Sequence, residues 1–343
     1  MFIYYILFSF SFVNILINKV KFSLFFMALL LIISAFRFEI GFDWFNYKDI
    51  YLHHFTSYFN DEFIFYYIVN ISKSLGFDYK SFIFLCSSFT CLLFYFSFFK
   101  IFNNKEVPLV LTYFVLSCIY FEHYNVIRQG LAVPFFLLSW YFILRKKFLA
   151  YVVCILIASL IHTSAILLLP CYFFLDKRIF ESKYIYVAIL LFLILFTRMD
   201  VNSILVKLMG YFDYFDFVNR YLNSNLINFT ESKSNLGLTK LYPALLFVFC
   251  LIFSELKLDN RKNIIFFNAY FISIIFLLLS YSLDILFRFY AYFEISMIFS
   301  FVVLFSGFNR KSRIALHFLN MVVYLIITNN FLMIMDMVPY RFN

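Results

Sequence analysis

Long apolar runs alternate with short polar segments along nearly the whole chain, from Met1 to Val338. Such runs are typical of membrane-spanning helices, because a backbone in lipid must satisfy its hydrogen bonds within the segment itself. The pattern therefore predicts an all-α, polytopic integral membrane protein with about 12 transmembrane helices. The predicted spans cover approximately residues 2–18, 22–36, 81–99, 107–121, 130–144, 148–161, 164–175, 184–197, 239–254, 264–281, 285–306 and 314–335.

Lysine and arginine residues fall into six short clusters between these runs, and the clusters hold more than half of the 28 basic residues. Cytoplasmic loops of membrane proteins carry an excess of Lys and Arg, so we assign all six clusters to the cytoplasm. Both termini and the more polar loops then face outward. The clusters are Lys19/Lys21, Lys100/Lys105, Arg145/Lys146/Lys147, Lys177/Arg178/Lys183, Lys257/Arg261/Lys262 and Arg310/Lys311/Arg313.

Two segments depart from simple crossings. Residues 148–175 lie between two basic clusters and must cross twice, although each half is shorter than the ~20 residues that a full span prefers. We expect a short helical hairpin there, with its tip at residues 161–164. Residues 61–77 are apolar on one face only, which fits a re-entrant or interfacial helix better than a further crossing.

Residues 198–238 interleave aromatic and charged positions, which predicts an amphipathic extracytoplasmic segment on the membrane surface. The first apolar segment lacks a basic leader and a small-residue cleavage site, so we expect it to be a retained helix. No internal repeat or flexible linker divides the chain. Residues 1–343 are therefore predicted to form a single integral membrane domain.

Composition supports this class. Hydrophobic residues make up 64% of the 343 residues, and the mean hydropathy is +0.90, which is more than a soluble core absorbs. The net charge of +9 needs no nucleic acid, because the positive-inside rule and anionic membrane lipid account for it. The cysteines lack metal-ligand spacing and lie in apolar stretches, so we expect small buried side chains without disulfides. They are Cys86, Cys91, Cys118, Cys154, Cys171 and Cys250.

The densest outward motif begins with Arg37, at the end of the second predicted span. A glycine that relaxes the backbone follows, and then Asp43, Asn46 and Tyr47. These residues predict a rigid polar loop that faces a ligand. The alternative is that Arg37 reaches towards the lipid headgroups while Glu39 and Asp43 merely cap it.

A second motif lies where the chain turns back into the membrane after residue 121. Arg128 and Gln129 stand at the start of a predicted helix, whose N-terminus adds a partial positive charge. This arrangement suits an anionic oxygen. The alternative is that Arg128 forms an ion pair with Glu122 at the membrane interface.

His162 lies at the tip of the predicted hairpin, in an otherwise apolar run, and Thr163 and Ser164 follow it. A near-neutral imidazole on the outer side can act as a general base or donate a hydrogen bond to a hydroxyl. The alternative is a structural histidine that bonds a backbone carbonyl in a broken helix.

Three arginines therefore come from three separate outward segments. Arg288 opens a late span four residues after Asp284, and it is either the partner of that acid or a further cation. Guanidinium groups are permanently charged and bind phosphate oxygens in a bidentate manner. We predict that Arg37, Arg128 and Arg288 together bind a pyrophosphate at the membrane surface.

These motifs resemble the EpsG-like family of Wzy-type polysaccharide polymerases. The signatures occur in the family's order over roughly residues 1–175, and a late Arg-x-Tyr follows at Arg288. Ile40 and Trp44 depart from the residues most frequent in the family without changing the charge arrangement. The matching segments are residues 37–47, Glu62–Phe63, residues 127–132 and residues 161–165.

The resemblance implies a glycosyltransferase that moves a glycan from undecaprenyl pyrophosphate to a lipid-linked repeat unit. The reaction would occur on the outer face of the bacterial cytoplasmic membrane, in the synthesis of O-antigen lipopolysaccharide, capsule or exopolysaccharide. His162 or Asp43 would take the proton of the attacking hydroxyl, while Gln129, Asn46 and Tyr47 orient sugar or phosphate. A chain-length regulator and a flippase are the expected protein partners.

No Asp-x-Asp-like metal pair stands in the outward loops, so we expect a metal-independent enzyme without a cofactor, in which arginine neutralises the phosphates. Two other functions stay open. A flippase or transporter of lipid-linked oligosaccharide would need charges deep in its helices and some repeat symmetry, whereas apart from Glu294 the charges here cluster near span ends. A membrane O-acyltransferase acting on the same glycan would also use an embedded histidine.

Overall fold

The computed structural model describes residues 1–41, 43–54, 62–197, 237–255, 258, 260–281 and 286–342. Of the predicted surface segment, residues 198–236 lie outside the described residues. The chain divides into two compact units. Unit 1 consists of Met1–Asp176 and Arg310–Asn343, and unit 2 of Lys177–Asn309. The predicted single membrane domain stays a prediction.

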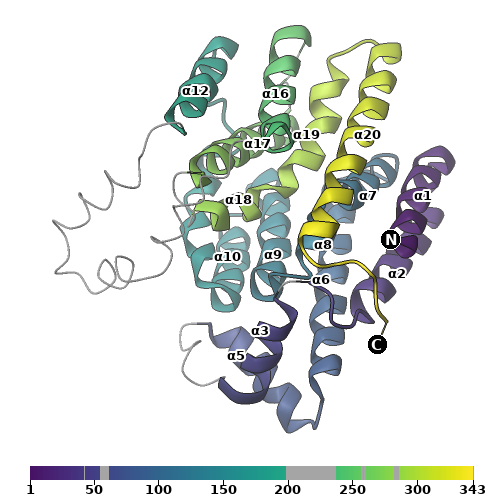
Figure 1. Ribbon diagram of the computed structural model, residues 1–343. Helices are drawn as coiled ribbons and strands as arrows, with labels where there is room; N and C mark the ends of the chain where they lie inside the picture. Colours follow the sequence, from purple (N-terminus) through teal and green to yellow (C-terminus); the bar gives the residue numbers. More distant parts are fainter. Residues whose placement is uncertain are drawn as a thin grey trace. The chain divides into compact units, whose positions relative to one another are not determined.

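The described residues form helices and connecting turns, which confirms the all-α class (Figure 1). The helices of unit 1 are α1 (Phe2–Ile17), α2 (Val20–Ala35), α3 (Trp44–Asp49), the π-helical η1 (Ile50–His54), α5 (Phe63–Ser74), α6 (Tyr79–Ile101), α7 (Val107–Leu116), α8 (Ile119–Glu122), α9 (Ile127–Leu144), α10 (Phe148–Ile161), the 3-10 helix η2 (Thr163–Leu168), α11 (Cys171–Phe174) and α20 (Arg310–Ile334). Those of unit 2 are α12 (Lys183–Phe196), α16 (Leu238–Phe253), α17 (Arg261–Ser280), α18 (Phe287–Phe293) and α19 (Ile295–Ser306).

Most predicted spans coincide with one helix, but three of them are broken. Cys118 adopts a left-handed conformation (φ 71°) and separates α7 from α8. Pro170 stands between η2 and α11, where its missing amide proton removes a helical hydrogen bond. The last broken pair, α18 and α19, bends by 49° at Glu294. Apolar composition marked these segments correctly but did not reveal the breaks.

Fewer than twelve helices among the described residues are long enough to cross a membrane by themselves. Among the described residues, α6, α9, α17 and α20 are long and apolar enough to cross a membrane, and the bent pair α18–α19 would be a fifth span. The other apolar helices have only 10–17 residues, whereas a straight span needs about 20. The chain is therefore a helical membrane protein, and the count of twelve is not confirmed.

Helix α5 occupies the segment predicted to be re-entrant or interfacial. Phe65 and Val69 are buried on one face, whereas Phe63, Tyr67 and Ile71 on the other are each more than half exposed. A short helix with one exposed apolar stripe is typical of a helix that lies in a membrane interface. Its placement in the interface stays a prediction.

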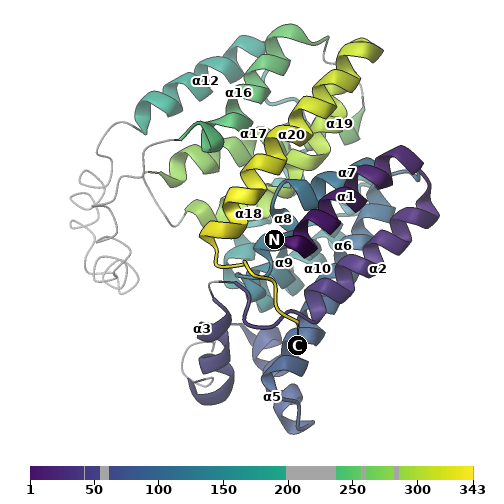
Figure 2. The same cartoon turned by 45° about the vertical axis from the view of Figure 1, so that its right-hand side comes forward.

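Hydrogen bonds between helices define two ends of unit 1. Asn14 Nδ2 donates to the carbonyl oxygen of Pro108 at 2.9 Å, and Ser23 Oγ donates to Asn14 Oδ1 at 2.8 Å, so the α1–α2 turn lies beside the start of α7. We call this the basic end, because four of the six basic clusters lie there (Figures 1 and 2). Those clusters are the ones at Lys19, Lys100, Arg145 and Arg310.

The opposite end of unit 1, which we call the motif end, carries Arg37, Arg128 and His162. The C-terminal strap, residues 335–342, crosses this end and reaches the end of α2 (Figures 1 and 2). The amide of Phe38 donates to the carbonyl oxygen of Arg341 at 3.0 Å, and Arg37 and Phe342 form an isolated antiparallel bridge. The last residues of the chain therefore hold the backbone on which the first motif begins.

Unit 2 is built around α17, which packs against α18, α19 and α12. Asn268 Nδ2 donates to the carbonyl oxygen of Lys177 at 2.7 Å, and Lys183 Nζ donates to that of Ile252 at 3.4 Å. These bonds bring residues 177–183 to the same end of unit 2 as the start of α17, where Arg261 and Lys262 lie; Lys257 lies outside the described residues. Within each unit the basic clusters thus share one end, as the positive-inside pattern predicts.

Candidate active site

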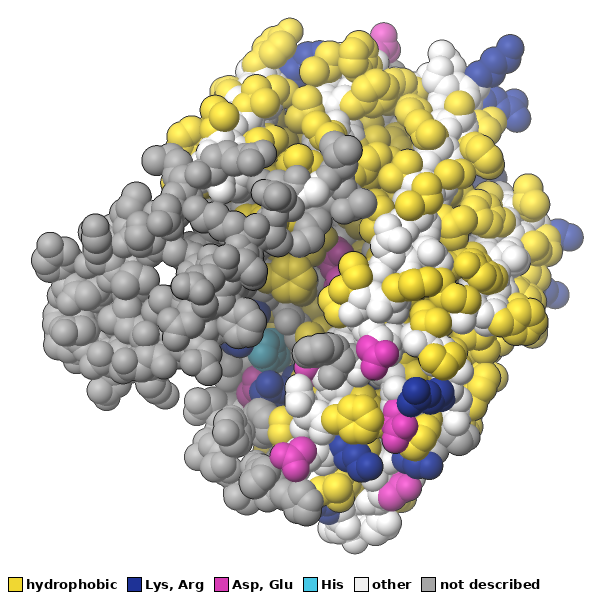
Figure 3. Space-filling model, in the orientation of Figure 1, with side chains coloured by type: hydrophobic (Ala, Val, Ile, Leu, Met, Phe, Trp, Pro, Cys, Tyr) yellow, Lys and Arg dark blue, Asp and Glu magenta, His cyan; other side chains and the backbone are white. Residues whose placement is uncertain are grey.

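The candidate site lies at the motif end of unit 1, where four segments meet. Arg128 is the second residue of α9, Glu62 directly precedes α5, and His162 connects α10 to η2. The fourth segment is the loop after Arg37, which leads into α3. Acidic and basic side chains gather on the lower part of the visible face, in the region of α3 and α5, whereas hydrophobic side chains predominate above it (Figure 3).

Glu62 is the centre of this site and uses both carboxylate oxygens. Its Oε2 accepts from Arg128 Nη1 at 2.7 Å, and its Oε1 lies 2.7 Å from His162 Nδ1. The Glu62 side chain is 6% exposed, that of His162 is 11% and that of Arg128 is 27%. Short bonds that involve charged groups are the strong ones, and partial burial shields them from water.

The charge state of Glu62 follows from three influences on its pKa. Burial, the largest, would raise that pKa, but the hydrogen bond with His162 and the charge of Arg128 together lower it below its ordinary value. The carboxylate is therefore ionised at neutral pH and can only accept hydrogen bonds. His162 Nδ1 consequently carries the proton in this contact.

The other ring nitrogen of His162, Nε2, is the one that could accept a proton. Nε2 has no hydrogen-bond partner among the described residues. With the proton of a neutral imidazole on Nδ1, Nε2 keeps its lone pair. The predicted alternative, a histidine whose ring bonds a backbone carbonyl, is not what the structure contains, because the ring partner is a carboxylate.

Helix α3 and the residue directly before it add three polar side chains to the cluster. The Arg128 backbone amide and Nε each donate to Tyr47 Oη at 3.5 Å, and the guanidinium lies 5.9 Å from the Tyr47 ring centre. Asn46 Nδ2 donates to Asp43 Oδ1 at 3.2 Å. Burial raises the pKa of Asp43, and the bond from Asn46 and the charge of Arg128 offset this only in part.

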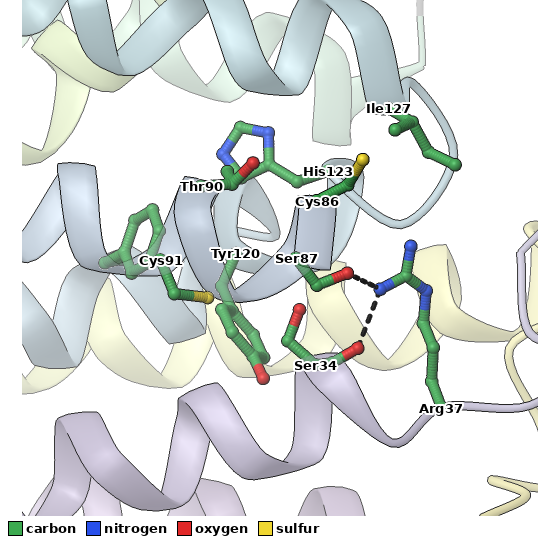
Figure 4. A pocket seen from close by; sticks show the side chains of 10 residues that line it. Ser34, Arg37, Cys86, Ser87, Thr90, Cys91, Tyr120, His123 and Ile127 are labelled. Atoms are coloured by element: carbon green, nitrogen blue, oxygen red, sulfur yellow. Dashed lines mark hydrogen bonds between the residues drawn. The ribbon is translucent and has the colours of Figure 1, made fainter. Parts of the chain in front are cut away.

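Arg37 lies in the interior beside this cluster. The residue is 2% exposed, and Nη1 donates to the carbonyl oxygen of Ser34 at 2.7 Å and to Ser87 Oγ (Figure 4). The carbonyl belongs to the negative end of α2, which favours a cation. The guanidinium also stands 4.7 Å from the ring centre of Tyr124. These partners replace the alternative pairing with Glu39, which instead binds Arg341 at 3.2 Å.

A small cavity lies between Arg37 and the start of α9. Arg37 points into it from the loop side, and Ile127, the first residue of α9, lies opposite (Figure 4). The Arg37 guanidinium lies 6.0 Å from the ring centre of Trp44, and that of Arg128 lies 5.9 Å from the ring centre of Tyr47, so both arginines lie beside α3. The cavity is lined by Ser34, Arg37, Cys86, Ser87, Thr90, Cys91, Phe114, Tyr120, His123 and Ile127.

Gly41 fixes the distance between the first motif and the turn before α9. Its φ of +97° suits glycine only. A Cβ at this position would lie 2.7 Å from Asn125 Oδ1 and 3.2 Å from the carbonyl oxygen of Tyr124. The two motifs recognised in the sequence therefore touch each other at a residue that has no side chain.

The structure brings together most, but not all, of the predicted site residues. Arg128, His162, Asp43, Asn46 and Tyr47 share one cluster, and Arg37 lies beneath the loop. Gln129 is buried in the first turn of α9 (7% exposed), and Arg288 is an exposed residue of α18, which belongs to unit 2. Asp284, its alternative partner, lies outside the described residues.

Glu62 is the site residue that sequence reasoning did not assign. An acid directly before an amphipathic helix is an ordinary feature, because it favours the positive helix N-terminus. The available signal was its place in the resemblance, next to Phe63. All six cysteines are free and buried, as predicted.

Comparison with known proteins gives a family but no close relative. No curated protein and no solved structure matches the chain. The EpsG family model matches residues 20–342, which include the first motif, Glu62, the start of α9, His162 and the C-terminal strap. The match covers nearly the whole chain and agrees with the motifs and with the helical membrane fold. The chain belongs to the EpsG family, which is of the Wzy-like polymerase type.

Proposed function

We propose that this protein is a polysaccharide polymerase that transfers a glycan from undecaprenyl pyrophosphate to a lipid-linked repeat unit. The product would be an O-antigen, capsule or exopolysaccharide chain. The observation that carries the proposal is the arrangement in which Glu62 binds both Arg128 and His162. It places a cation for an anionic leaving group beside a nitrogen that can accept a proton.

Arg128 is the residue that binds the pyrophosphate of the donor. Its side chain is 27% exposed while one nitrogen is anchored on Glu62, so the charge is both accessible and oriented. The N-terminus of α9 adds a partial positive charge next to it. Arg37 supports this binding from beneath, because it holds the start of the loop and adds a second permanent charge. The binding of pyrophosphate by Arg288 stays a prediction from the sequence.

The transfer step balances with His162 as the base. The oxygen of the acceptor hydroxyl attacks the anomeric carbon of the donor sugar, and the bond between that carbon and the pyrophosphate oxygen breaks. Undecaprenyl pyrophosphate leaves with the electron pair, and the hydroxyl proton moves to His162 Nε2 and then to water. Positive charge beside the leaving oxygens stabilises the transition state. No step in this scheme needs a metal or a cofactor.

Asp43 is the second candidate base. Burial raises its pKa, and a base works best when its pKa approaches the working pH. Asn46 and Tyr47 would orient sugar or phosphate from the same helix. Gln129 is buried, so in this proposal it supports the start of α9 from within.

The outward orientation of the site is part of the proposal. The basic end and the motif end lie at opposite ends of unit 1, and cytoplasmic loops are the ones enriched in Lys and Arg. The motif end would then face the outer side of the bacterial cytoplasmic membrane, where a flippase delivers lipid-linked repeat units. A chain-length regulator is the other proposed protein partner.

Purified protein in lipid nanodiscs, supplied with a polyprenyl-pyrophosphate-linked repeat unit, tests the proposal directly. We expect products of two or more repeats, release of polyprenyl pyrophosphate and no loss of activity with EDTA. A strain that lacks the gene should export glycans of a single repeat. Absence of exported repeats would identify a flippase, and full-length chains that lack acyl groups would identify an acyltransferase.

A further inference from the structure

Glu62 holds its two partners with different oxygens. Oε1 faces His162 Nδ1, Oε2 faces Arg128 Nη1, and both distances are 2.7 Å. The partners are 100 and 66 positions away along the chain. A side chain that is 6% exposed and binds two such distant groups sets their relative position. Glu62 itself is turned towards both of them and away from solvent.

We infer that Glu62 is the positioning residue of the reaction, which fixes the tautomer of His162 and the place of Arg128 with one carboxylate. This inference rests on the proposed polymerase function. Glu62 does not touch substrate in this account. It acts through His162 Nε2, the atom that takes the proton, and through the guanidinium that meets the pyrophosphate.

The carboxylate of Glu62 sets the tautomer of His162. An ionised carboxylate offers only acceptors, so its partner nitrogen must be the protonated one. Nδ1–H then directs the lone pair of Nε2 away from Glu62. Ser-His-Asp triads use the same logic, and there the change from carboxylate to amide costs about 10⁴-fold in kcat because the tautomer becomes wrong.

Glu62 also orients the guanidinium of Arg128. Its Nη1 donates to Glu62 while its Nε donates to Tyr47 Oη, so the plane of the guanidinium is defined by two contacts. Guanidinium binding of phosphate depends on that plane more than on the charge alone. A single carboxylate thus sets the spacing between the proton acceptor and the pyrophosphate site.

Glu62→Gln separates the two roles. An amide has one acceptor oxygen and one donor nitrogen, so it cannot satisfy both partners as a carboxylate does. The charged Arg128 takes the oxygen, because its hydrogen bond is the stronger one. The amide nitrogen then faces His162 Nδ1 and favours the tautomer with the proton on Nε2, which cannot accept the hydroxyl proton.

The kinetic test compares kcat and KM for the lipid-linked donor. For Glu62→Gln we expect kcat to fall about 1,000-fold or more, whereas KM for the donor changes less than about tenfold because Arg128 keeps a partner. Glu39→Gln is the matched control, since it makes the same change in an ion pair at the same end of unit 1. It should leave kcat near that of the unchanged protein.

The spectroscopic test reads the tautomer itself. Protein with ¹⁵N-labelled histidine is measured by solid-state NMR in lipid, and loss of a signal in His162→Phe assigns that residue. We expect a protonated Nδ1 and an unprotonated Nε2 in the unchanged protein, and the reverse in Glu62→Gln. The measurement on the unchanged protein needs no substituted carboxylate to fold.

Two results would overturn the inference. One is a protonated Nε2 at His162 in the unchanged protein at neutral pH. The other is a Glu62→Gln protein with an unaltered tautomer and an unaltered kcat. Failure of polymerisation by the unchanged protein would count against the proposed function instead, because the tautomer is measured without substrate.

Discussion

Arg37 and Arg128 stand at the same end of unit 1, and each lies beside an aromatic side chain of α3, yet they are held in opposite ways. Arg37 is 2% exposed, and its partners among the described residues are neutral: a backbone carbonyl, a serine and aromatic rings. Arg128 has a side chain that is 27% exposed and a carboxylate partner. Arg37 caps the C-terminal end of α2, whereas the charge of Arg128 is accessible to solvent.

This difference shows what a charge can do in each environment. A cation that caps the carbonyl end of α2 stabilises the fold wherever the substrate is, because its partners are all internal. A cation that is anchored on a carboxylate and partly exposed can exchange part of its hydration for a ligand. Both positions use the fork of donors that arginine provides, but only the Arg128 side chain is partly exposed.

Arg128→Lys gives the largest expected effect. An ammonium keeps the charge but cannot bind Glu62, Tyr47 and a pyrophosphate in one plane. We expect polymer formation to fall by about 100-fold or more, while the amount of protein in the membrane stays unchanged. The measurement is polymer length on gels of extracted glycan, beside an immunoblot of the membrane fraction. Normal long-chain polysaccharide in this strain would remove Arg128 from the site.

Arg37→Lys should affect the fold more than the chemistry. The lysine stem ends short of the position of Nη1, so the bonds to Ser34 and Ser87 are lost or weakened. Bonds of this type to charged groups contribute about 1.5–3 kcal/mol each, and we expect a loss of about 3 kcal/mol in the free energy of unfolding. A lower melting temperature and less protein in the membrane would show it. An unchanged melting temperature together with lost activity would make Arg37 a ligand residue like Arg128.

Gly41→Ala tests the contact that joins the two regions. The new Cβ would meet Asn125 Oδ1 at 2.7 Å, and the φ of +97° is strained for alanine. Such strain costs about 2 kcal/mol, and relief by a shift of the loop would move α3 away from α9. We expect a lower melting temperature and a higher KM for the donor. Gly76→Ala is a control, since its φ is also positive but its Cβ would meet no atom within 4 Å.

The helices were largely predictable because apolar runs need no partner to be recognised. Helix α10 covers Phe148–Ile161, the predicted range. The breaks at Cys118 and Glu294 were not predicted, because a left-handed residue or a bend does not change the hydropathy of the segment. The predicted count of twelve crossings is not confirmed for a related reason: hydropathy finds a segment, whereas its helical length decides whether it can span.

The site was predictable only in part. Arg128, His162 and Tyr47 were found because their residue types are unusual at outward turns. Glu62 was missed because its meaning depends on partners 66 and 100 positions away. Arg37 was found, but its burial was not, since Ser87 lies 50 positions further along the chain. The sequence shows which reactive side chains are present, and long-range contacts determine which of them share a site.

Arg341→Ala should have the smallest effect, although Arg341 lies directly over the Arg37 region. Its ion pair with Glu39 is 3.2 Å long, and the two side chains are 52% and 28% exposed, so water screens the attraction. Exposed pairs of this kind contribute less than about 1 kcal/mol. The C-terminal strap does not depend on this pair, because the bond from Phe38 uses the backbone carbonyl of Arg341 and survives the substitution. We therefore expect a melting temperature within a few degrees of the unchanged protein and normal polymer. A large fall in the melting temperature would mean that side-chain charge holds the strap. The Arg37 region would then depend on an exposed ion pair, as the Arg128 region depends on a buried one.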